Sequence, residues 1–517
     1  MATLPARPDL DQLRRQAKDL LRAARSGDAD AVDRMLAVSD RLALSAARLV
    51  LAREHGFPSW ARLREEVLAR TTALPELVRA FCEASISDWT GRAVRMLSAR
   101  PEIASAGLAP AVVLGEVAAV RAILARDPAA ATRPDPASEW TPLHAVCASR
   151  WHRLDPARAD GLTAVAELLL DAGADATAAV GSRSWTPLRC AVAGVANPPI
   201  VRLLLERGAV PDDHDLYLAC FGEDNHESLR LLLKRLPSIA GTTALAAPIS
   251  AGDTEGVRLL LQSGADPNTP LPAELNGVEA PTVYAAIRAD CPIELIRLLL
   301  EAGADPNATG PDGYTPEQLA ARRGRSDVVR LLRQHGARPS ATEVDHFLAA
   351  CLHADRPAAQ RLLDEGRVRS DQLTDDDHAA LYRAAEIGSS AAVRLMIDLG
   401  FPVDARGGDD GGTSLHAAAY HGSDMVARLL VDRGADLEAR DTSWDSTPLV
   451  WAMVGSSTRP TLNLKADWVA TVQTLLAAGA TMAGITLSAD DDHPPSAEVA
   501  QLLRAHGVPD DDTEVET

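Results

Sequence analysis

Histidine and cysteine are the side chains of this sequence with the widest chemical repertoire, and their spacing decides whether they can form a site. The six cysteines are scattered and include no Cys-x-x-Cys pair, so they predict neither a zinc site nor a disulfide framework. Cys351 and His353 are two residues apart and would point to different faces of a helix, which argues against a nucleophile–base pair. We therefore expect reduced, buried cysteines.

Short motifs for enzymatic chemistry are also missing from the sequence. It contains no Gly-x-Ser-x-Gly, no His-Glu-x-x-His and no glycine-rich phosphate loop. Acidic clusters at 375–378, 407–412 and 490–493 lack the alternating ligands, central glycine and closing glutamate of a calcium loop. The sequence therefore predicts no catalytic residue, no metal, no cofactor and no small-molecule substrate, and we expect the protein not to be an enzyme.

The net charge of the chain restricts the classes of molecule that we expect it to bind. The chain has 517 residues, a formal net charge of -20 and a pI near 5.1. A field of this sign repels phosphate backbones and anionic lipids, so we expect neither nucleic acid nor a membrane surface as a partner. The N-terminal stretch has no apolar signal segment, and the chain has no long uncharged apolar run. We expect a cytoplasmic protein.

An internal repeat supplies the elements that position the polar residues. Similar segments, most of them starting Thr-Pro, begin at Thr141, Thr186, Thr315, Thr413 and Thr447. A second, leucine-rich run ends each time at a glycine, among them Gly173, Gly303 and Gly434. Threonine caps a helix through its hydroxyl, proline fits the first helical position, and glycine takes the left-handed conformation past a helix end. Each unit is therefore predicted to be two helices, and one unit cannot bury its apolar face alone.

The repeat resembles a known family. A period near 33 residues, with Thr-Pro-Leu-His at the first helix and Gly-Ala-Asp after the second, resembles the ankyrin repeat. The chain is similar to bacterial ankyrin-repeat proteins over most of its length. The resemblance implies an all-α solenoid of helix-turn-helix repeats with short hairpin loops, about twelve of them once degenerate copies are included. It also implies that His144 and His416 hydrogen-bond the backbone between adjacent repeats.

Departures from the repeat pattern suggest where the chain divides. Residues 1–72 are helical but share the pattern only loosely, and we expect an N-terminal helical segment there. Residues 75–340 form a first block of repeats, because the motif degrades near 336–347. Residues 341–508 form a second block with a C-terminal cap, and the acidic tail at 509–517 is expected to be disordered.

Aromatic residues mark candidate contact points in a chain with only 3% aromatics. Rings stand at or near the position before the threonine of a repeat at Trp140, Trp185, Tyr314 and Trp444. The resemblance implies that these loop tips and the first helices line a concave face that usually binds the partner. The rings are therefore candidate anchors. The alternative is that each ring packs on the neighbouring loop tip.

An insertion adds a second candidate region. Residues 149–161 lengthen the turn between the helices of one repeat and are locally basic, with Arg150 and Arg153 as candidate contacts. An acidic partner or an anion could dock there, and a salt bridge between loops explains the pattern equally well.

The sequence thus favours a non-catalytic scaffold that binds an unidentified protein partner through its concave face and loop tips. Two alternatives stay open. One is a self-assembling regulatory protein, and the other is an enzyme subunit whose chemistry lies outside the repeats.

Overall fold

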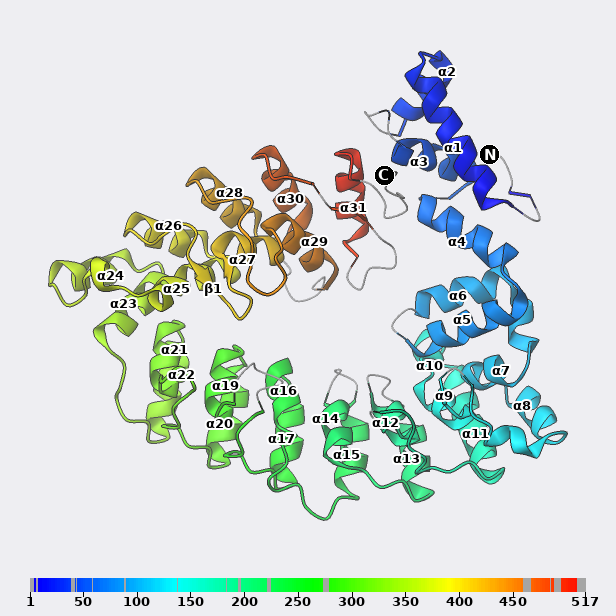
Figure 1. Ribbon diagram of the computed structural model, residues 1–517. Coiled ribbons are helices and arrows are strands. Elements are labelled where there is room, and N and C mark those ends of the chain that lie inside the picture. Colours follow the sequence, from blue (N-terminus) through cyan, green and yellow to red (C-terminus); the bar gives the residue numbers. More distant parts are fainter. Residues whose placement is uncertain are drawn as a thin grey trace.

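The computed structural model describes residues 4–5, 8–38, 42, 44–57, 59–87, 90–136, 138–182, 184–193, 197–220, 225–272, 279–458, 466–483, 485–487 and 494–508. The described part is mostly helical, and its helices stack side by side in a strongly curved array (Figure 1). Two short strands, β1 (Arg406–Gly407) and β2 (Gly412–Thr413), form an antiparallel hairpin ahead of one helix pair. The expectation of an all-α solenoid with short hairpin loops is confirmed.

From residue 74 onward the helices come in consecutive pairs. The first helices are α5 (Leu74–Ile86), α7 (Leu108–Leu114), α9 (Pro142–Ala148), α12 (Pro187–Val192), α14 (Asp213–Ala219), α16 (Ala246–Ala251), α19 (Thr282–Arg288), α21 (Pro316–Arg322), α23 (Glu343–Leu352), α25 (Asp375–Glu386), α27 (Ser414–Tyr420) and α29 (Pro448–Thr458). The second helices are α6 (Thr90–Ala99), α8 (Val117–Leu124), α11 (Arg158–Asp171), α13 (Pro198–Glu206), α15 (His226–Leu233), α17 (Thr254–Gln262), α20 (Ile293–Glu301), α22 (Ser326–Gln334), α24 (Arg356–Asp364), α26 (Ser390–Asp398), α28 (Asp424–Asp432) and α30 (Trp468–Ala477).

Other elements flank or interrupt the pairs. At the N-terminus lie α1 (Leu10–Arg25), α2 (Ala29–Leu36), α3 (Leu44–Glu54) and α4 (Trp60–Thr71), and α31 (Ala497–Ala505) follows the last pair. Short pieces are α10 (Trp151–Leu154) and the 3₁₀ turns η1 (Pro101–Ser105), η2 (Pro128–Ala131) and η3 (Ser370–Gln372).

Local sequence explains where the helices of a repeat begin and end. The Thr315 hydroxyl accepts the Gln318 backbone N–H at 3.2 Å, and the Gln318 side chain accepts the Thr315 N–H at 3.0 Å. Pro316 follows at the first helical position, where its missing N–H leaves no hydrogen bond unmade. Past the second helices, Gly303 and Gly434 have φ of +96° and +85°, the left-handed region that glycine enters without steric cost.

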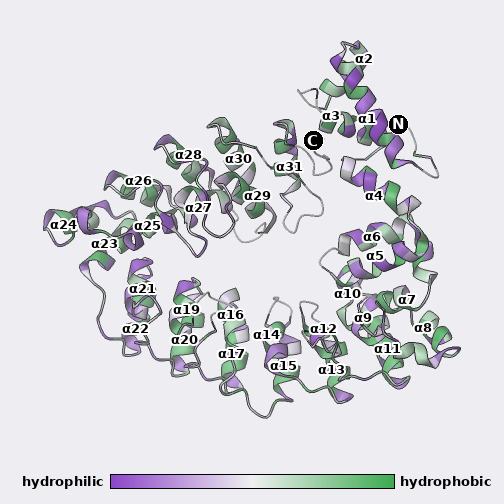
Figure 2. Cartoon of the chain, viewed as in Figure 1, coloured by the Kyte–Doolittle hydropathy of each residue, from purple (hydrophilic) through white to green (hydrophobic). Residues whose placement is uncertain are grey.

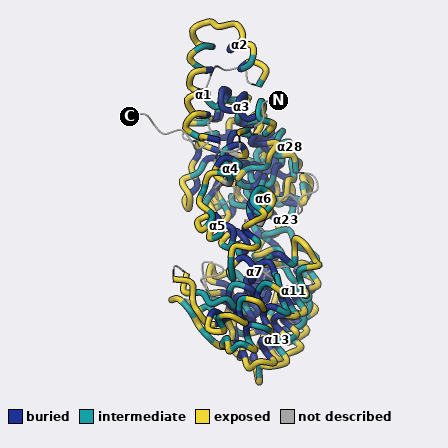
Figure 3. The backbone as a smooth tube through the Cα atoms, turned by 90° about the vertical axis from the view of Figure 1, so that its right-hand side faces the viewer, coloured by how far each residue is buried: buried dark blue, intermediate teal, exposed yellow. Residues whose placement is uncertain are grey.

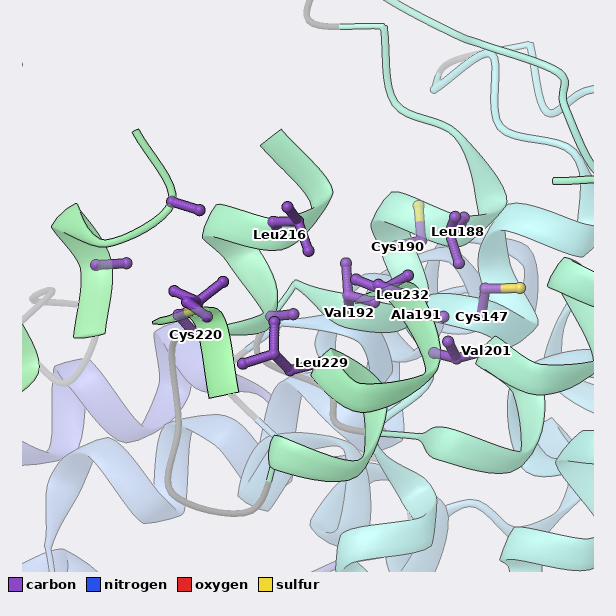
Figure 4. Packing of buried hydrophobic residues seen from close by; sticks show 14 of the residues in the cluster. Cys147, Leu188, Cys190, Ala191, Val192, Val201, Leu216, Cys220, Leu229 and Leu232 are labelled. Atoms are coloured by element: carbon purple, nitrogen blue, oxygen red, sulfur yellow. The ribbon is translucent and has the colours of Figure 1, made fainter. Parts of the chain in front are cut away.

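Small apolar residues fill the space between neighbouring pairs. Cys147 and Cys190 lie fully buried among Leu188, Val201 and other aliphatic residues (Figure 4). Hydrophobic segments run along the packed helices, and many hydrophilic ones lie at loops and helix ends (Figure 2). Viewed edge-on, buried backbone runs inside the array, flanked by exposed turns (Figure 3). Each pair therefore buries its apolar surface against the next one.

The buried residues form three separate cores. One joins residues 13–67 of the N-terminal helices, one runs from Leu77 to Ala337, and one runs from Phe347 to Val508. The cores lie inside the three expected folded segments, and independent folding of those segments stays a prediction. The expected tail at 509–517 lies outside the described residues.

The array bends between the second and third cores. On the inner side, α21 packs on α23. On the outer side, α22 packs on the preceding helix α20 but not closely on the following helix α24. The bend turns the first helices before residue 340 toward those after it, so that α19 and α21 lie opposite α25 and α27 (Figure 1).

Two buried histidines connect adjacent repeats through hydrogen bonds that require the neutral imidazole. His416 Nε2 lies 3.0 Å from the carbonyl oxygen of Ser446 and must donate to it, so Nδ1 accepts the Thr413 backbone N–H at 3.0 Å. His144 Nε2 likewise donates to the carbonyls of Ala178 and Trp185, at 3.1 Å each. Burial lowers the pKa of both imidazoles below the usual value, since desolvation opposes the charged form.

Acidification is expected to weaken the array through these two histidines. Because folding lowers the pKa of both imidazoles, their contribution to the free energy of unfolding is complete above the unfolded pKa of about 6.5. That contribution is lost as the pH falls through the folded pKa. Urea midpoints measured from pH 7.5 to 5 should depend less on pH in a His144→Gln/His416→Gln variant. Glutamine suits the position, since Gln318 occupies it in another repeat. A variant whose urea midpoint changes with pH as steeply as that of the wild type would contradict this explanation.

Substitution of Gly434 by Val is expected to weaken the C-terminal repeats first. A β-branched residue at φ +85° costs about 1–2 kcal/mol, and no neighbouring atom lies within 4 Å of the added Cβ, so the cost is conformational. Hydrogen exchange should show faster exchange in α28 to α31. The control is Gly434→Asn, which tolerates this conformation. Uniform loosening along the whole array would contradict the expectation.

Candidate partner-binding surface

The inner face of the array is hollowed where it bends. The hollow has a volume of about 1310 Å³ and is lined mainly by α19, α21, α25, α27, α29 and the loops that precede them. The first helices carry the lining because their outer sides are used in packing on the second helices. A surface of this size and position can hold a ligand considerably larger than a metabolite.

Aromatic side chains concentrate in the hollow. Four of the five tyrosines of the chain line it, Tyr284, Tyr314, Tyr382 and Tyr420, together with Trp444 and Trp451. Tyr314 donates its hydroxyl to Asp376 at 2.8 Å, and its ring lies 4.5 Å from the Arg322 guanidinium. Burial and the Asp376 carboxylate raise the pKa of Tyr314 to about 12, so its hydroxyl stays a neutral donor.

Trp444 and Trp451 differ in how much each side chain contacts the rest of the protein. The indole N–H of Trp451 donates to Asp441 at 2.9 Å, which fixes its ring beside His416. Trp444 is 72% exposed on the loop tip and has its ring free to meet a partner.

Ion pairs cross the hollow and connect the two blocks of repeats. Arg322 contacts Asp377 at 2.7 Å and Asp345 at 3.1 Å. Burial raises the pKa of Asp377, but hydrogen bonds from the Thr374 backbone and from Arg322 outweigh it, and the pKa is lowered.

Two further pairs join the blocks at longer sequence distance. Arg383 pairs with Asp290, and Arg288 pairs with Asp409 of the β1–β2 hairpin. These contacts join residues on both sides of the bend, so they fix the two walls of the hollow relative to each other.

The predicted aromatic anchors fall into two groups. Tyr314 and Trp444 line the hollow. Trp140 and Trp185 lie on neighbouring loop tips elsewhere, with ring centroids 6.5 Å apart, and both are half-buried. The structure therefore does not bring all four rings to one surface, and the Trp140–Trp185 pair matches the alternative in which rings pack on adjacent tips.

The basic insertion is also separate from the hollow. Its Trp151 is buried and donates its indole N–H to Ser85 at 3.0 Å. The Arg150 backbone N–H donates to the Ser85 carbonyl at 3.1 Å, while the Arg153 side chain is exposed. The insertion is thus hydrogen-bonded to α5, and Arg153 lies in its solvent-exposed stretch, residues 153–157.

Sequence inspection missed several residues that line the hollow. They are Tyr284, Tyr382, Tyr420 and Trp451 among the rings, and Arg288, Arg322, Arg323 and Arg383 among the cations. One signal could have found the region, namely that four of five tyrosines fall between residues 284 and 420.

The described residues offer little for catalysis or metal binding. Within them no group of three or more His, Cys, Asp or Glu side chains could hold a metal ion. Burial raises the pKa of Cys291 and Cys351 to about 12, which keeps these thiols protonated and poorly nucleophilic. No described helix is both long and apolar enough to cross a membrane.

Helix pairs that stack on one another and share a continuous core define the class of helical repeat solenoids. Two family models specify the kind of repeat. Residues 283–333 match ankyrin repeats (many copies), and residues 347–441 match ankyrin repeats (3 copies). The chain therefore contains ankyrin repeats and has the ankyrin-repeat fold.

Solved structures similar to the chain include the human ASB11 ankyrin repeat domain, at 23% identity over 46% of this chain and 98% of that one, with a TM-score of 0.21. The ankyrin repeat domain of Bcl-3, a member of the IkappaB protein family, shares 24% identity over 40% of this chain and 92% of its own, with a TM-score of 0.19. No curated protein matches the chain.

Removal of Arg322 is expected to destabilise the bend. Its side chain is 10% exposed and those of Asp345 and Asp377 are 2% and 9% exposed, so Arg322→Gln leaves two buried carboxylates unpaired. We expect a loss of about 3 kcal/mol in urea unfolding. Small-angle X-ray scattering should also show a larger maximum dimension as the two blocks separate.

The matched control is Arg369→Gln. Arg369 pairs with Asp371, but both side chains are more than 60% exposed, so the loss of stability should be much smaller than for Arg322→Gln. Equal losses in the two variants would show that the Arg322 contacts do not hold the bend.

Proposed function

We propose that this protein is a non-catalytic scaffold that binds a protein partner through the inner face of its ankyrin array. Ankyrin repeats are in general modules of protein–protein interaction. The observation that carries the proposal is the hollow of about 1310 Å³, bordered by first helices and loop tips and lined by six of the chain's aromatic rings. Aromatic and arginine side chains are the residues that dominate binding energy at protein interfaces.

Trp444 is the best single contact for this proposal. It lines the hollow, is 72% exposed, and packs little against its own chain, so its removal affects binding more than folding. Trp140 and Trp185 form a second candidate surface on loop tips outside the hollow. Both surfaces are compatible with one extended partner, and variants can separate them.

A partner captured from lysate of the source organism should lose affinity for Trp444→Ala by at least about tenfold, as for a truncated hot-spot residue. Affinity is measured by calorimetry with the purified partner. The matched control is Met425→Ala, since Met425 is also 72% exposed but lies on the second helix α28. Circular dichroism verifies that each variant is folded.

The Trp140→Ala/Trp185→Ala variant completes the comparison. Loss of binding in this variant alone would move the partner surface to the loop tips. Unchanged binding in both tryptophan variants would contradict an interface on the inner face and tips. A sizing column on the purified protein would reveal self-association as the competing role.

A further inference from the structure

Most of the arginines that line the hollow are paired with carboxylates of the protein itself. Arg322 has carboxylate partners at 2.7–3.1 Å, Arg383 pairs with Asp290 and with Glu386, and Arg288 pairs with Asp409. Buried or half-buried charges are usually paired in this way, because desolvation without a partner is costly.

Arg323 is the exception. It lines the hollow as the C-cap of α21, is half-buried, and its guanidinium makes no hydrogen bond or ion pair with any described residue. Burial lowers the pKa of Arg323 from its usual value, and the carboxylate of Glu386 offsets only part of this shift. The side chain nevertheless stays charged, because arginine does not deprotonate in proteins. Its donors are available to a ligand.

A second unused donor lies in the same hollow. The Tyr382 hydroxyl makes no hydrogen bond with any described residue, and burial raises its pKa, so it stays protonated. Gly407 and Gly408 pass directly over its ring, and a Cβ atom at Gly408 would come within 2.6 Å of the hydroxyl oxygen. The glycines therefore leave room for this phenol at the wall of the hollow.

The chemistry of the lining restricts the anion that these donors can accept. Six carboxylates, those of Asp290, Asp312, Asp376, Glu386, Asp409 and Asp410, also face the hollow. A doubly charged phosphate would meet strong repulsion from them, whereas a single carboxylate matches the bidentate geometry of one guanidinium.

The dimensions favour a peptide over a small molecule. Pockets for drug-sized ligands have volumes of about 300–1,000 Å³. The hollow is larger, at about 1310 Å³, and it extends along the first helices of several repeats. An extended segment would meet tyrosine rings contributed by several repeats.

We propose that the hollow binds an extended peptide segment of the partner and that an acidic side chain or C-terminal carboxylate of that segment pairs with Arg323. This inference rests on the proposed scaffold function and specifies the chemistry of the partner. The tyrosine rings contact the apolar side chains on either side of the acidic group.

The test begins with a phage-displayed library of random 12-residue peptides, selected on the full-length protein. Enriched peptides should share an Asp, a Glu or a free C-terminus at a fixed position. One enriched peptide is then labelled with fluorescein, and its affinity is measured by anisotropy for the wild type and for Arg323→Gln. The variant should bind about 30-fold more weakly or worse, as for a charge pair that has lost one partner.

A double-mutant cycle makes the test specific. Amidation of the peptide's carboxylate should weaken binding to the wild type but hardly affect binding to Arg323→Gln. The matched control is Arg330→Gln, an exposed arginine on α22 of the same repeat, which should bind like the wild type. Since Arg323 has no internal partner, Arg323→Gln should unfold at a temperature no lower than the wild type.

Three outcomes would overturn the inference: no peptide is enriched, the enriched peptides lack a carboxylate in common, or Arg323→Gln binds them with wild-type affinity. Its failure can be told apart from failure of the scaffold function. A partner that depends on Trp444 but not on Arg323 leaves the scaffold function intact and removes only the carboxylate contact.

Discussion

A helix pair in this array has more apolar surface than it can bury by itself, and its neighbours are the only elements that cover it. The continuous core from Leu77 to Ala337 is the direct result, because every pair contributes residues to the boundary with the next. Packing uses the outer sides of the first helices and leaves their inner sides free. The inner face can therefore vary in sequence without loss of the core, and this freedom is what a repeat scaffold offers to a binding function.

The bend before residue 343 changes what that inner face can do. A regular solenoid presents an open groove, and each repeat then meets a partner separately. Here α21 keeps its contact with α23 while the outer helices part, so that two stretches of inner face oppose each other. Arg322 and the Arg288–Asp409 pair stabilise this arrangement across the gap. The hollow is therefore a property of the junction between two blocks and of no single repeat.

This origin explains what the sequence could and could not predict. Helix pairs follow from local signals, such as the Thr315 cap and the glycine at Gly434, and these act within a few residues. The position directly before a repeat threonine marks Tyr314 in the sequence. Arg323 is the C-cap of α21 and Tyr382 lies within α25, two positions that no repeat motif marks, and only the bend gives them a shared environment. The Arg288–Asp409 pair joins residues 121 positions apart, which no periodicity can indicate.

The unpaired guanidinium of Arg323 affects both the stability of the free protein and its affinity for a ligand. A half-buried guanidinium without a carboxylate lowers the stability of the free protein, and a ligand that supplies the carboxylate recovers that free energy on binding. A small domain could lose its fold to such a group. In a repeat array the penalty stays local, because stability is a sum over repeats and their boundaries. The flanking pairs can therefore hold Arg323 in place, ready for a partner, while Arg322 beside it keeps the two walls together.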